Sequence, residues 1–286
     1  MRPFVLVTGA SSGIGYSACL ALSAKGYGVI AGIRNPADRE KFGASDQSFI
    51  FAVQLDVTDV QSLKAARAEA ERIMGNNSLV AIVNNAGIVV HGAVLYIPAE
   101  EWSRQLDVNV IGVIRTTQVF FPLLSKPRSP GDHHPRRIIN MSSVSGLFAS
   151  PFLGPYVASK FELEALSDTL RRELYMHDVQ VVIIEPGNIT TPIWEKARQE
   201  KAYFGPEYDS ILAFKEKMID GMIAGGIPVS YVDQAVVDAV SHPDPPLRYL
   251  IRKQKWKFRL IRLLPAKWVD KMITKRLRDK SGIRPF

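Results

Sequence analysis

A glycine-rich turn near the start of the chain constrains the fold more than any other stretch. Residues 4–7 form an apolar run typical of a short strand, and the sequence T-G-A-S-S-G-I-G follows it directly at residues 8–15. A helical stretch then continues to about residue 25. Glycines between a strand and a helix let the backbone approach a pyrophosphate at the helix N-terminus. The spacing is G-x-x-x-G-x-G rather than G-x-G-x-x-G, so the turn alone is weak evidence for a dinucleotide site.

Strands and helices alternate along the rest of the chain. Further strands are expected at residues 28–33, 49–55, 79–83, 138–141, 179–184 and 247–251. Helices are expected at residues 57–75, 98–124 and 156–177, and residues 188–229 have a helical but irregular pattern. This alternation predicts an α/β fold with a Rossmann-type, doubly wound parallel sheet of about seven strands, covered by helices on both faces. We predict one domain at residues 1–252, with a substrate lid at about residues 188–229, and a C-terminal extension at residues 253–286.

Composition limits where the protein works and what it binds. The chain has 286 residues, 47% of them hydrophobic, and it contains no apolar run of the length of about 18 residues that a transmembrane helix needs. We expect no signal peptide, and the single cysteine, Cys19, fits a reducing compartment. The adjacent His133 and His134 lie in a polar loop without a partner Cys/His pattern, so no metal site is expected. We predict a cytoplasmic protein.

Positive charge is concentrated in the C-terminal extension. The whole chain has a net charge of +8, but residues 247–286 alone hold 14 basic and 2 acidic residues. The main domain is therefore net negative, which argues against a nucleic-acid groove. After Pro265, apolar residues recur at helical spacing between lysines and arginines. A basic amphipathic helix of this kind is typical of a peripheral membrane contact, and a helix docked on the domain is an equally good interpretation.

Residues that could bind a ligand or take part in catalysis follow six of the expected strands. In a doubly wound sheet, ligands bind beyond the carboxyl ends of the strands. Each of these ends carries a residue suited to a ligand: the glycine turn, then Arg34, Asp56, Asn84, Ser143 and Pro186-Gly187. Their coincidence at one edge predicts a single ligand site more strongly than any one motif does.

Tyr156 and Lys160 lie four residues apart on an expected helix, and therefore on the same face. A phenol has an ordinary pKa of about 10, and a nearby ammonium lowers it. The pair could thus give a proton to a carbonyl oxygen or take one from an alcohol. Alone, this spacing is common by chance.

Taken together, these motifs resemble the short-chain dehydrogenase/reductase family over roughly residues 3–250, most closely its hydroxysteroid and retinol dehydrogenase branch. The sequences T-G-x-x-x-G-x-G, N-N-A-G at residues 84–87 and P-G-x-I-x-T at residues 186–191 match its cofactor motifs. Its catalytic tetrad corresponds to Asn109, Ser143, Tyr156 and Lys160. The resemblance implies that Tyr156 is the general acid or base, Lys160 lowers its pKa and binds the ribose, Ser143 orients the substrate oxygen, and Asn109 holds a relay water.

The same resemblance implies a set of residues around the dinucleotide. They are Thr8, Gly9, Ser11, Ser12, Gly13, Ile14, Gly15, Arg34, Asp56, Val57, Asn84, Ala86, Gly87, Tyr156, Lys160, Pro186, Gly187, Ile189 and Thr191. Some of these assignments have a purely structural alternative. Asp56 could be an N-cap or turn residue, Asn109 a buried amide that satisfies the backbone, and Asn84 a support for the sheet as well as the cofactor. A capping role fits Ser142 better than Ser143.

Charge at the end of the second strand indicates which cofactor is used. NAD-binding proteins usually place a carboxylate there, whereas this chain has Ile33 at that position and Arg34 after it. A carboxylate would repel a 2′-phosphate, and a guanidinium can clamp one. We predict NADP(H) as the preferred cofactor. NAD(H) is the alternative, because Asp38 lies close by and an arginine also stacks on adenine.

Apolar residues dominate the segments that this family folds over its substrate. They are Leu147, Phe148, Phe152, Leu153, Ile193, Trp194, Tyr203, Phe204, Ile211, Leu212, Phe214 and Met218. Such a lining predicts a small hydrophobic ketone or secondary alcohol, such as a steroid, a retinoid or another lipid. The alternatives are a 3-oxoacyl thioester reductase and a non-catalytic, NADP-sensing scaffold on the same fold. The resemblance also implies a homodimer paired through the helices that contain Asn109 and Tyr156.

Overall fold

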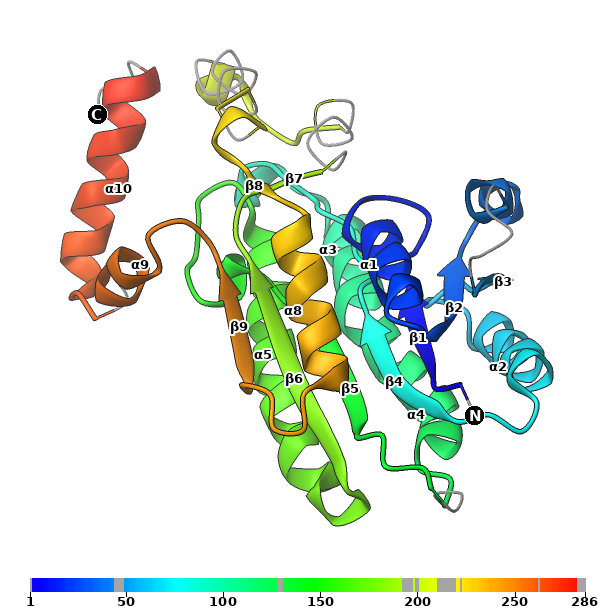
Figure 1. Cartoon of the computed structure of the whole chain (residues 1–286). Coiled ribbons are helices and arrows are strands. Elements are labelled where there is room, and N and C mark those ends of the chain that lie inside the picture. The colour runs from blue at the N-terminus through cyan, green and yellow to red at the C-terminus, as the bar shows by residue number, and fades with distance from the viewer. Residues whose placement is uncertain are drawn as a thin grey trace.

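The computed structural model describes residues 2–43, 49–127, 131–191, 198, 201–209, 220–221, 223–261 and 263–281, and strands alternate with helices along them (Figure 1). The strands are β1 (Phe4–Thr8), β2 (Gly28–Ile33), β3 (Ile50–Gln54), β4 (Leu79–Asn84), β5 (Arg136–Met141), β6 (Val179–Pro186), β7 (Ile189–Thr190), β8 (Ile227–Pro228) and β9 (Arg248–Ile251). The α-helices are α1 (Gly13–Ala24), α2 (Val60–Met74), α3 (Ala99–Leu106), α4 (Gly112–Leu124), α5 (Gly154–Glu173), α8 (Ser230–Ser241), α9 (Lys255–Ile261) and α10 (Ala266–Ser281). Shorter helical turns are η1 (Pro36–Phe42), η2 (Val94–Tyr96), η3 (Asp107–Ile111), η4 (Val144–Gly146), η5 (Leu174–His177) and η6 (Pro206–Tyr208).

Seven parallel strands form the main sheet in the order β3-β2-β1-β4-β5-β6-β9. The chain builds outward from β1 to β3 and then crosses back to β4 on the other side of β1. This reversal creates a crevice beyond the carboxyl ends of β1 and β4, where doubly wound sheets bind ligands. The predicted sheet is confirmed in strand number and direction.

Two apolar cores lie on opposite faces of the sheet. Val5 and Val7 of β1 belong to the core under α1 and α8, whereas Phe4 and Leu6 belong to the core under α2 and α4. Successive side chains of a strand point to opposite faces, so a strand buried on both sides is apolar at every position. All five residues of β1 are buried, which explains its unbroken apolar run.

The helix expected at residues 98–124 is interrupted. One turn of π-helix, η3, separates α3 from α4, and it buries Asn109 and Val110. A π turn contains an extra residue and often occurs at functional sites. The regular helical prediction was therefore wrong at the position of the predicted catalytic Asn109.

Two other local predictions also need correction. Helix α2 begins at Val60 rather than Val57, and its N-cap is Asp59, whose carboxylate accepts the backbone N–H of Gln61 at 2.8 Å. Asp56 instead holds a turn, accepting the backbone N–H of Thr58 at 2.9 Å. The segment after β6 is not purely helical, because β7 and β8 pair as a second small sheet. In the described part of the chain, no helix is long and apolar enough to cross a membrane.

Candidate active site

The end of β4 holds the glycine turn in place. The hydroxyl oxygen of Thr8 accepts the backbone N–H groups of Asn85 and Ala86, both at 3.0 Å. The side-chain amide of Asn85 donates in return to the carbonyl oxygens of Thr8 at 2.9 Å and Gly9 at 3.2 Å. These bonds fix the turn beside the crevice. Asn85 was not predicted as a site residue, although it stands within the N-N-A-G motif.

Helix α1 begins at this turn, with Ser12 at the N-cap position and no acidic residue in the first turn. The electropositive helix N-terminus favours a negatively charged group at the turn. On the other side of the crevice, the Cβ of Thr191 lies 3.8 Å from where a Cβ on Gly13 would be. The segment after β6 therefore reaches the glycine turn, as the two predicted cofactor motifs require.

Two cations lie on the segment that follows β2. Arg34 is exposed directly after β2. Lys41, at the end of η1, donates from Nζ to the carbonyl oxygen of Ser11 at 3.1 Å and pairs with the carboxylate of Asp38 at 2.7 Å. The negative charge that Asp38 would bring to this side of the site is thus compensated. Lys41 was missed by the sequence analysis; its spacing of three residues from Asp38 was the available signal.

Ser143, just after the end of β5, lies close enough to Tyr156 at the start of α5 for its hydroxyl to lower the pKa of the phenol. The hydroxyl oxygen of Ser143 also accepts the backbone N–H of Ser145 at 3.1 Å. Ser143 therefore caps η4, and the assignment of the cap to Ser142 was wrong. The capping bond holds the hydroxyl of Ser143 next to the phenol.

Lys160 is buried one helical turn beyond Tyr156. Its Nζ donates to the carbonyl oxygen of Met141 at 2.7 Å and lies 5.7 Å from the centre of the Tyr156 ring. Burial lowers the pKa of Lys160 to about 8, and the carboxylate of Glu164 opposes that shift. The ammonium therefore titrates near neutral pH.

Burial also sets the direction of the Tyr156 shift. It raises the pKa of the phenol above the ordinary value, and the hydrogen bond with Ser143 offsets part of that increase. The predicted net lowering by Lys160 is not observed here, because removing a phenolate from water outweighs the other effects. A phenol that stays protonated is suited to giving a proton.

Asn109 spans the gap between the loop after β4 and helix α5. Its side-chain oxygen accepts the backbone N–H of Ile88 at 2.9 Å, and its Nδ2 donates to the carbonyl oxygen of Ile88 and the hydroxyl of Ser159, both at 3.1 Å. Ser159 in turn donates to the backbone carbonyl of Tyr156 at 2.7 Å. The side chain of Asn109 thus satisfies backbone groups and fixes the start of α5, which is the structural alternative for this residue. Ser159 was missed by the sequence analysis.

The remaining predicted residues lie at the same edge of the sheet. The side chain of Asn84 supports the sheet, because its Nδ2 donates to Asn140 Oδ1 at 2.9 Å. The backbone N–H of Gly187 donates to the carbonyl of Ile251 at 2.8 Å, and Ile189 is buried in β7. Val57, Ala86 and Pro186 follow or end β3, β4 and β6.

Aromatic rings gather where the loop before α5 meets the segment after β6. Phe152, Phe204 and Tyr208 are in mutual contact, with ring centres 5.4–5.8 Å apart. Gly92 joins the two segments: its N–H donates to the carbonyl of Phe152, and a Cβ there would lie 2.3 Å from the carbonyl oxygen of Tyr203. The predicted lining residues Ile193, Trp194, Ile211, Leu212, Phe214 and Met218 lie outside the described residues.

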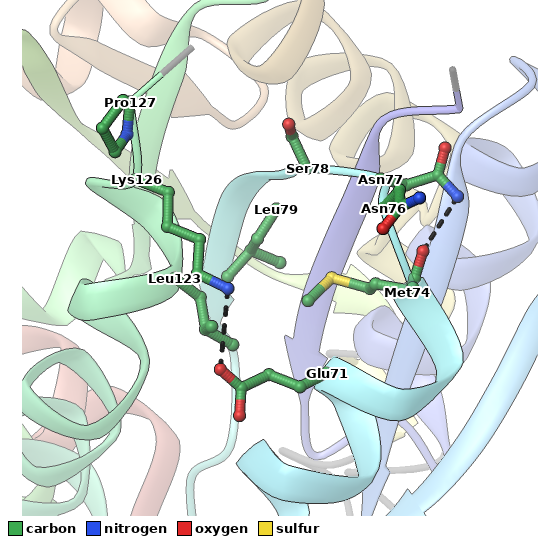
Figure 2. Close-up of a pocket in the computed structure, with 10 residues that line it drawn as sticks. Glu71, Met74, Asn76, Asn77, Ser78, Leu79, Leu123, Lys126 and Pro127 are labelled. Atoms are coloured by element: carbon green, nitrogen blue, oxygen red, sulfur yellow. Dashed lines mark hydrogen bonds and ion pairs between the residues drawn. The ribbon is translucent and has the colours of Figure 1, made fainter. Parts of the chain in front are cut away.

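A separate cavity of about 240 Å³ lies at the opposite end of the sheet (Figure 2). It is bounded by the end of α2, the start of β4 and the end of α4, and Lys126 reaches across it to pair with Glu71 at 3.7 Å. None of its lining residues belongs to the site described above.

Comparison with known proteins decides which family this arrangement represents. The family model described as short chain dehydrogenase matches residues 3–202. The chain belongs to the short-chain dehydrogenase/reductase family. It is therefore an oxidoreductase, and both the predicted family and the predicted enzyme class are confirmed.

Individual relatives of this dehydrogenase match over nearly its whole length. The NADPH-dependent 3-dehydrocapnine reductase of Ornithobacterium rhinotracheale is 34% identical, over 96% of this chain and 97% of its own. Retinol dehydrogenase 5 of Mus musculus is 30% identical, over 95% of this chain and 87% of its own. The crystal structure of a short-chain dehydrogenase from Streptomyces avermitilis superposes with a TM-score of 0.76 at 26% identity, covering 100% of this chain and 99% of that one.

Proposed function

We propose that this dehydrogenase transfers a hydride between NADP(H) and a hydrophobic ketone or secondary alcohol, with Tyr156 as the general acid or base. The observation that carries the proposal is the grouping of three side chains: the Ser143 hydroxyl acts on the Tyr156 phenol, and the buried Lys160 lies one turn away from Tyr156 on the same helix. Two hydroxyls that converge on one oxygen stabilise the charge that develops on it. The relatives named above as a reductase and a retinol dehydrogenase support this reaction class.

In the reducing direction, the O–H of Tyr156 gives its proton to the substrate carbonyl oxygen while Ser143 holds that oxygen by a hydrogen bond. In the oxidising direction, Tyr156 takes the proton of the alcohol. The hydride itself is supplied or accepted by the bound nicotinamide cofactor. Lys160 holds a positive charge beneath the phenol, and the carbonyl of Met141 keeps its ammonium in place.

The residues at the crevice fit a dinucleotide with a 2′-phosphate. The glycine turn and the start of α1 would hold the pyrophosphate. Arg34 and Lys41 would hold the 2′-phosphate, since no carboxylate ends β2 and Asp38 is already paired with Lys41. The NADPH dependence stated in the name of the Ornithobacterium relative agrees with this choice.

Replacing Arg34 by alanine is expected to raise the KM for NADPH by about 10- to 100-fold, because charge-assisted contacts are worth about 1.5–3 kcal/mol. The KM for NADH should change little, since NADH has no 2′-phosphate. Steady-state kinetics with both cofactors, on a panel of hydrophobic ketones, test the cofactor and the substrate class together. Arg172→Ala, an exposed arginine on α5, is the matched control. Equal losses with both cofactors, or turnover with NADH alone, would overturn the choice of NADP(H).

Activity should fall as pH rises through the pKa of Lys160, because the ammonium is charged only below that value. Glu164 raises that pKa, so Glu164→Gln is expected to move the alkaline limb of the kcat profile to lower pH. Glu173→Gln, at the exposed end of the same helix, should leave the profile unchanged. A pH–rate profile from about pH 6 to 10, the range set by these pKa values, makes the comparison. If the alkaline limb of the kcat profile did not move in Glu164→Gln, the ionisation of Lys160 would not be what limits activity at high pH.

Finer features of the organisation also remain proposals. We place the catalytic domain at residues 1–252, because β9 completes the sheet at Ile251. Exposed apolar residues on the helices that contain the site, Ile111 and Phe161, support a homodimer paired through them. The buried free thiol of Cys19 agrees with a reducing, cytoplasmic location.

A further inference from the structure

Several large apolar side chains of the C-terminal helices α9 and α10, and of the short link between them, are exposed. Exposed fractions are 62% for Trp256, 54% for Leu260, 81% for Leu263, 65% for Trp268 and 44% for Met272. A helix docked on the domain would bury such a stripe. Figure 1 shows α10 standing beside the domain rather than lying against the sheet. The apolar surface of these helices, called here the C-terminal ridge, is therefore available for another contact.

One side chain anchors α9 to the site. Phe258 is only 4% exposed, and its ring packs edge-on against Phe148 with centres 6.2 Å apart. The guanidinium of Arg252 lies 4.2 Å above the same ring. Phe148 belongs to the loop between Ser143 and Tyr156, so the C-terminal ridge is fixed to the loop that borders the catalytic residues. It also lies at the edge of the sheet where β6 and β9 end (Figure 1).

Cations surround the ridge. Exposed basic side chains on and beside the two helices are Lys253, Lys255, Lys257, Arg259, Lys267, Lys271, Lys275 and Arg278. No ion pair among the described residues involves any of them. Residues 253–286 hold 12 basic and 2 acidic residues in total. The surface thus combines exposed tryptophan and leucine with a concentrated positive charge.

We propose that the C-terminal ridge docks on the surface of an anionic lipid bilayer. Tryptophan and leucine insert between the headgroups, while lysines and arginines attract anionic lipids. A second copy is the poorer occupant, because it would bring the same excess of positive charge to the interface. Nucleic acid would match the charge and leave the apolar ridge in water.

Docking in this way brings the loop between Ser143 and Tyr156 next to the bilayer, because Phe258 ties the ridge to Phe148 of that loop. A lipid-like substrate could then pass between the membrane and Tyr156 over a short path. This consequence rests on the proposed function, whereas membrane docking itself does not. Binding and turnover therefore need separate measurements.

Vesicle flotation of the full-length protein tests the proposal. The vesicles contain phosphatidylcholine alone or phosphatidylcholine mixed with phosphatidylglycerol. We expect flotation only with the anionic vesicles, and weaker flotation at high salt. The triple variant Lys267→Glu, Lys271→Glu, Lys275→Glu should lower the partition coefficient about 100-fold or more, at about 1 kcal/mol for each lost cation. The double variant Trp268→Ser, Met272→Ser should also lower the partition coefficient, although it leaves the charge of the protein unchanged.

The matched controls lie away from the ridge: Lys64→Glu on α2 and Met176→Ser on η5, both exposed. They should float like the unchanged protein. Turnover of a water-soluble ketone should persist in all variants, which shows that they are folded and separates this proposal from the catalytic one. No flotation on anionic vesicles, flotation that the ridge variants do not reduce, or self-association through the ridge in light scattering would each overturn it.

Discussion

Replacing Tyr156 by phenylalanine is expected to lower kcat by about 1,000-fold, within the range that general acid–base groups contribute. The variant keeps the ring and loses only the hydroxyl, which is the proton donor in the proposed reaction. The affinity for NADPH should change less than threefold, because the cofactor contacts proposed above do not use that hydroxyl. Stopped-flow or steady-state absorbance of NADPH measures kcat, and fluorescence titration measures the affinity.

Tyr175→Phe is the matched control, since this tyrosine is 86% exposed on η5. It should keep full activity. If Tyr156→Phe retained more than a tenth of the turnover, another group would have to supply the proton. Loss of cofactor affinity together with turnover would instead indicate a disturbed site. A non-catalytic scaffold would show no turnover even before substitution.

Replacing Gly15 by alanine is expected to lower the free energy of unfolding by about 2–3 kcal/mol and to abolish nucleotide binding. A Cβ there would lie 2.4 Å from the carbonyl oxygen of Gly9 and from Nδ2 of Asn85, closer than real Cβ atoms approach. Alanine has a higher helix propensity than glycine, so the substitution would otherwise stabilise α1. A loss of stability can therefore be attributed to the clash of the added Cβ. Thermal unfolding should show a fall in Tm of about 3–5 °C.

Gly43→Ala provides the comparison, because its φ is −80° and the nearest atom to the added Cβ is 3.6 Å away. This change should leave Tm within about 2 °C, the shift expected for a substitution worth less than about 0.5 kcal/mol. If the Gly15→Ala protein were as stable as the unchanged one and still bound nucleotide, the backbone of the glycine turn would have to move enough to accept the added Cβ. The close approach of α1 to Gly9 and Asn85 would then be unnecessary for the site.

Most of the fold was predictable because its information is local. Apolar runs such as β1 are buried on both faces of the sheet, so periodicity alone locates them. Residues that end parallel strands meet at one edge, so the glycine turn, Ser143 and Tyr156 could be grouped before the structure was known. The π turn at Asn109 could not be predicted, because it forms no pattern that differs from a regular helix.

Residues whose roles depend on distant partners were missed for the same reason. Asn85 holds the turn through the carbonyls of Thr8 and Gly9, and Lys41 contacts Ser11 thirty residues earlier in the chain. The direction of the Tyr156 pKa shift also needed the structure, because burial is a property of the whole packing rather than of neighbours in sequence.

Periodicity and motif spacing were enough to predict the parallel sheet, the family and the residue types at the site, because both patterns are carried by residues close together in the chain. The three-dimensional structure was needed to show that Ser143 rather than Ser142 caps η4, that Asp38 is paired with Lys41, and that the C-terminal ridge is exposed. The capping bond and the Asp38–Lys41 pair join residues two and three positions apart, so the sequence allowed these contacts without selecting them. The exposure of the C-terminal ridge depends on which surfaces meet when distant segments pack, because amphipathicity alone does not specify the partner of a helix.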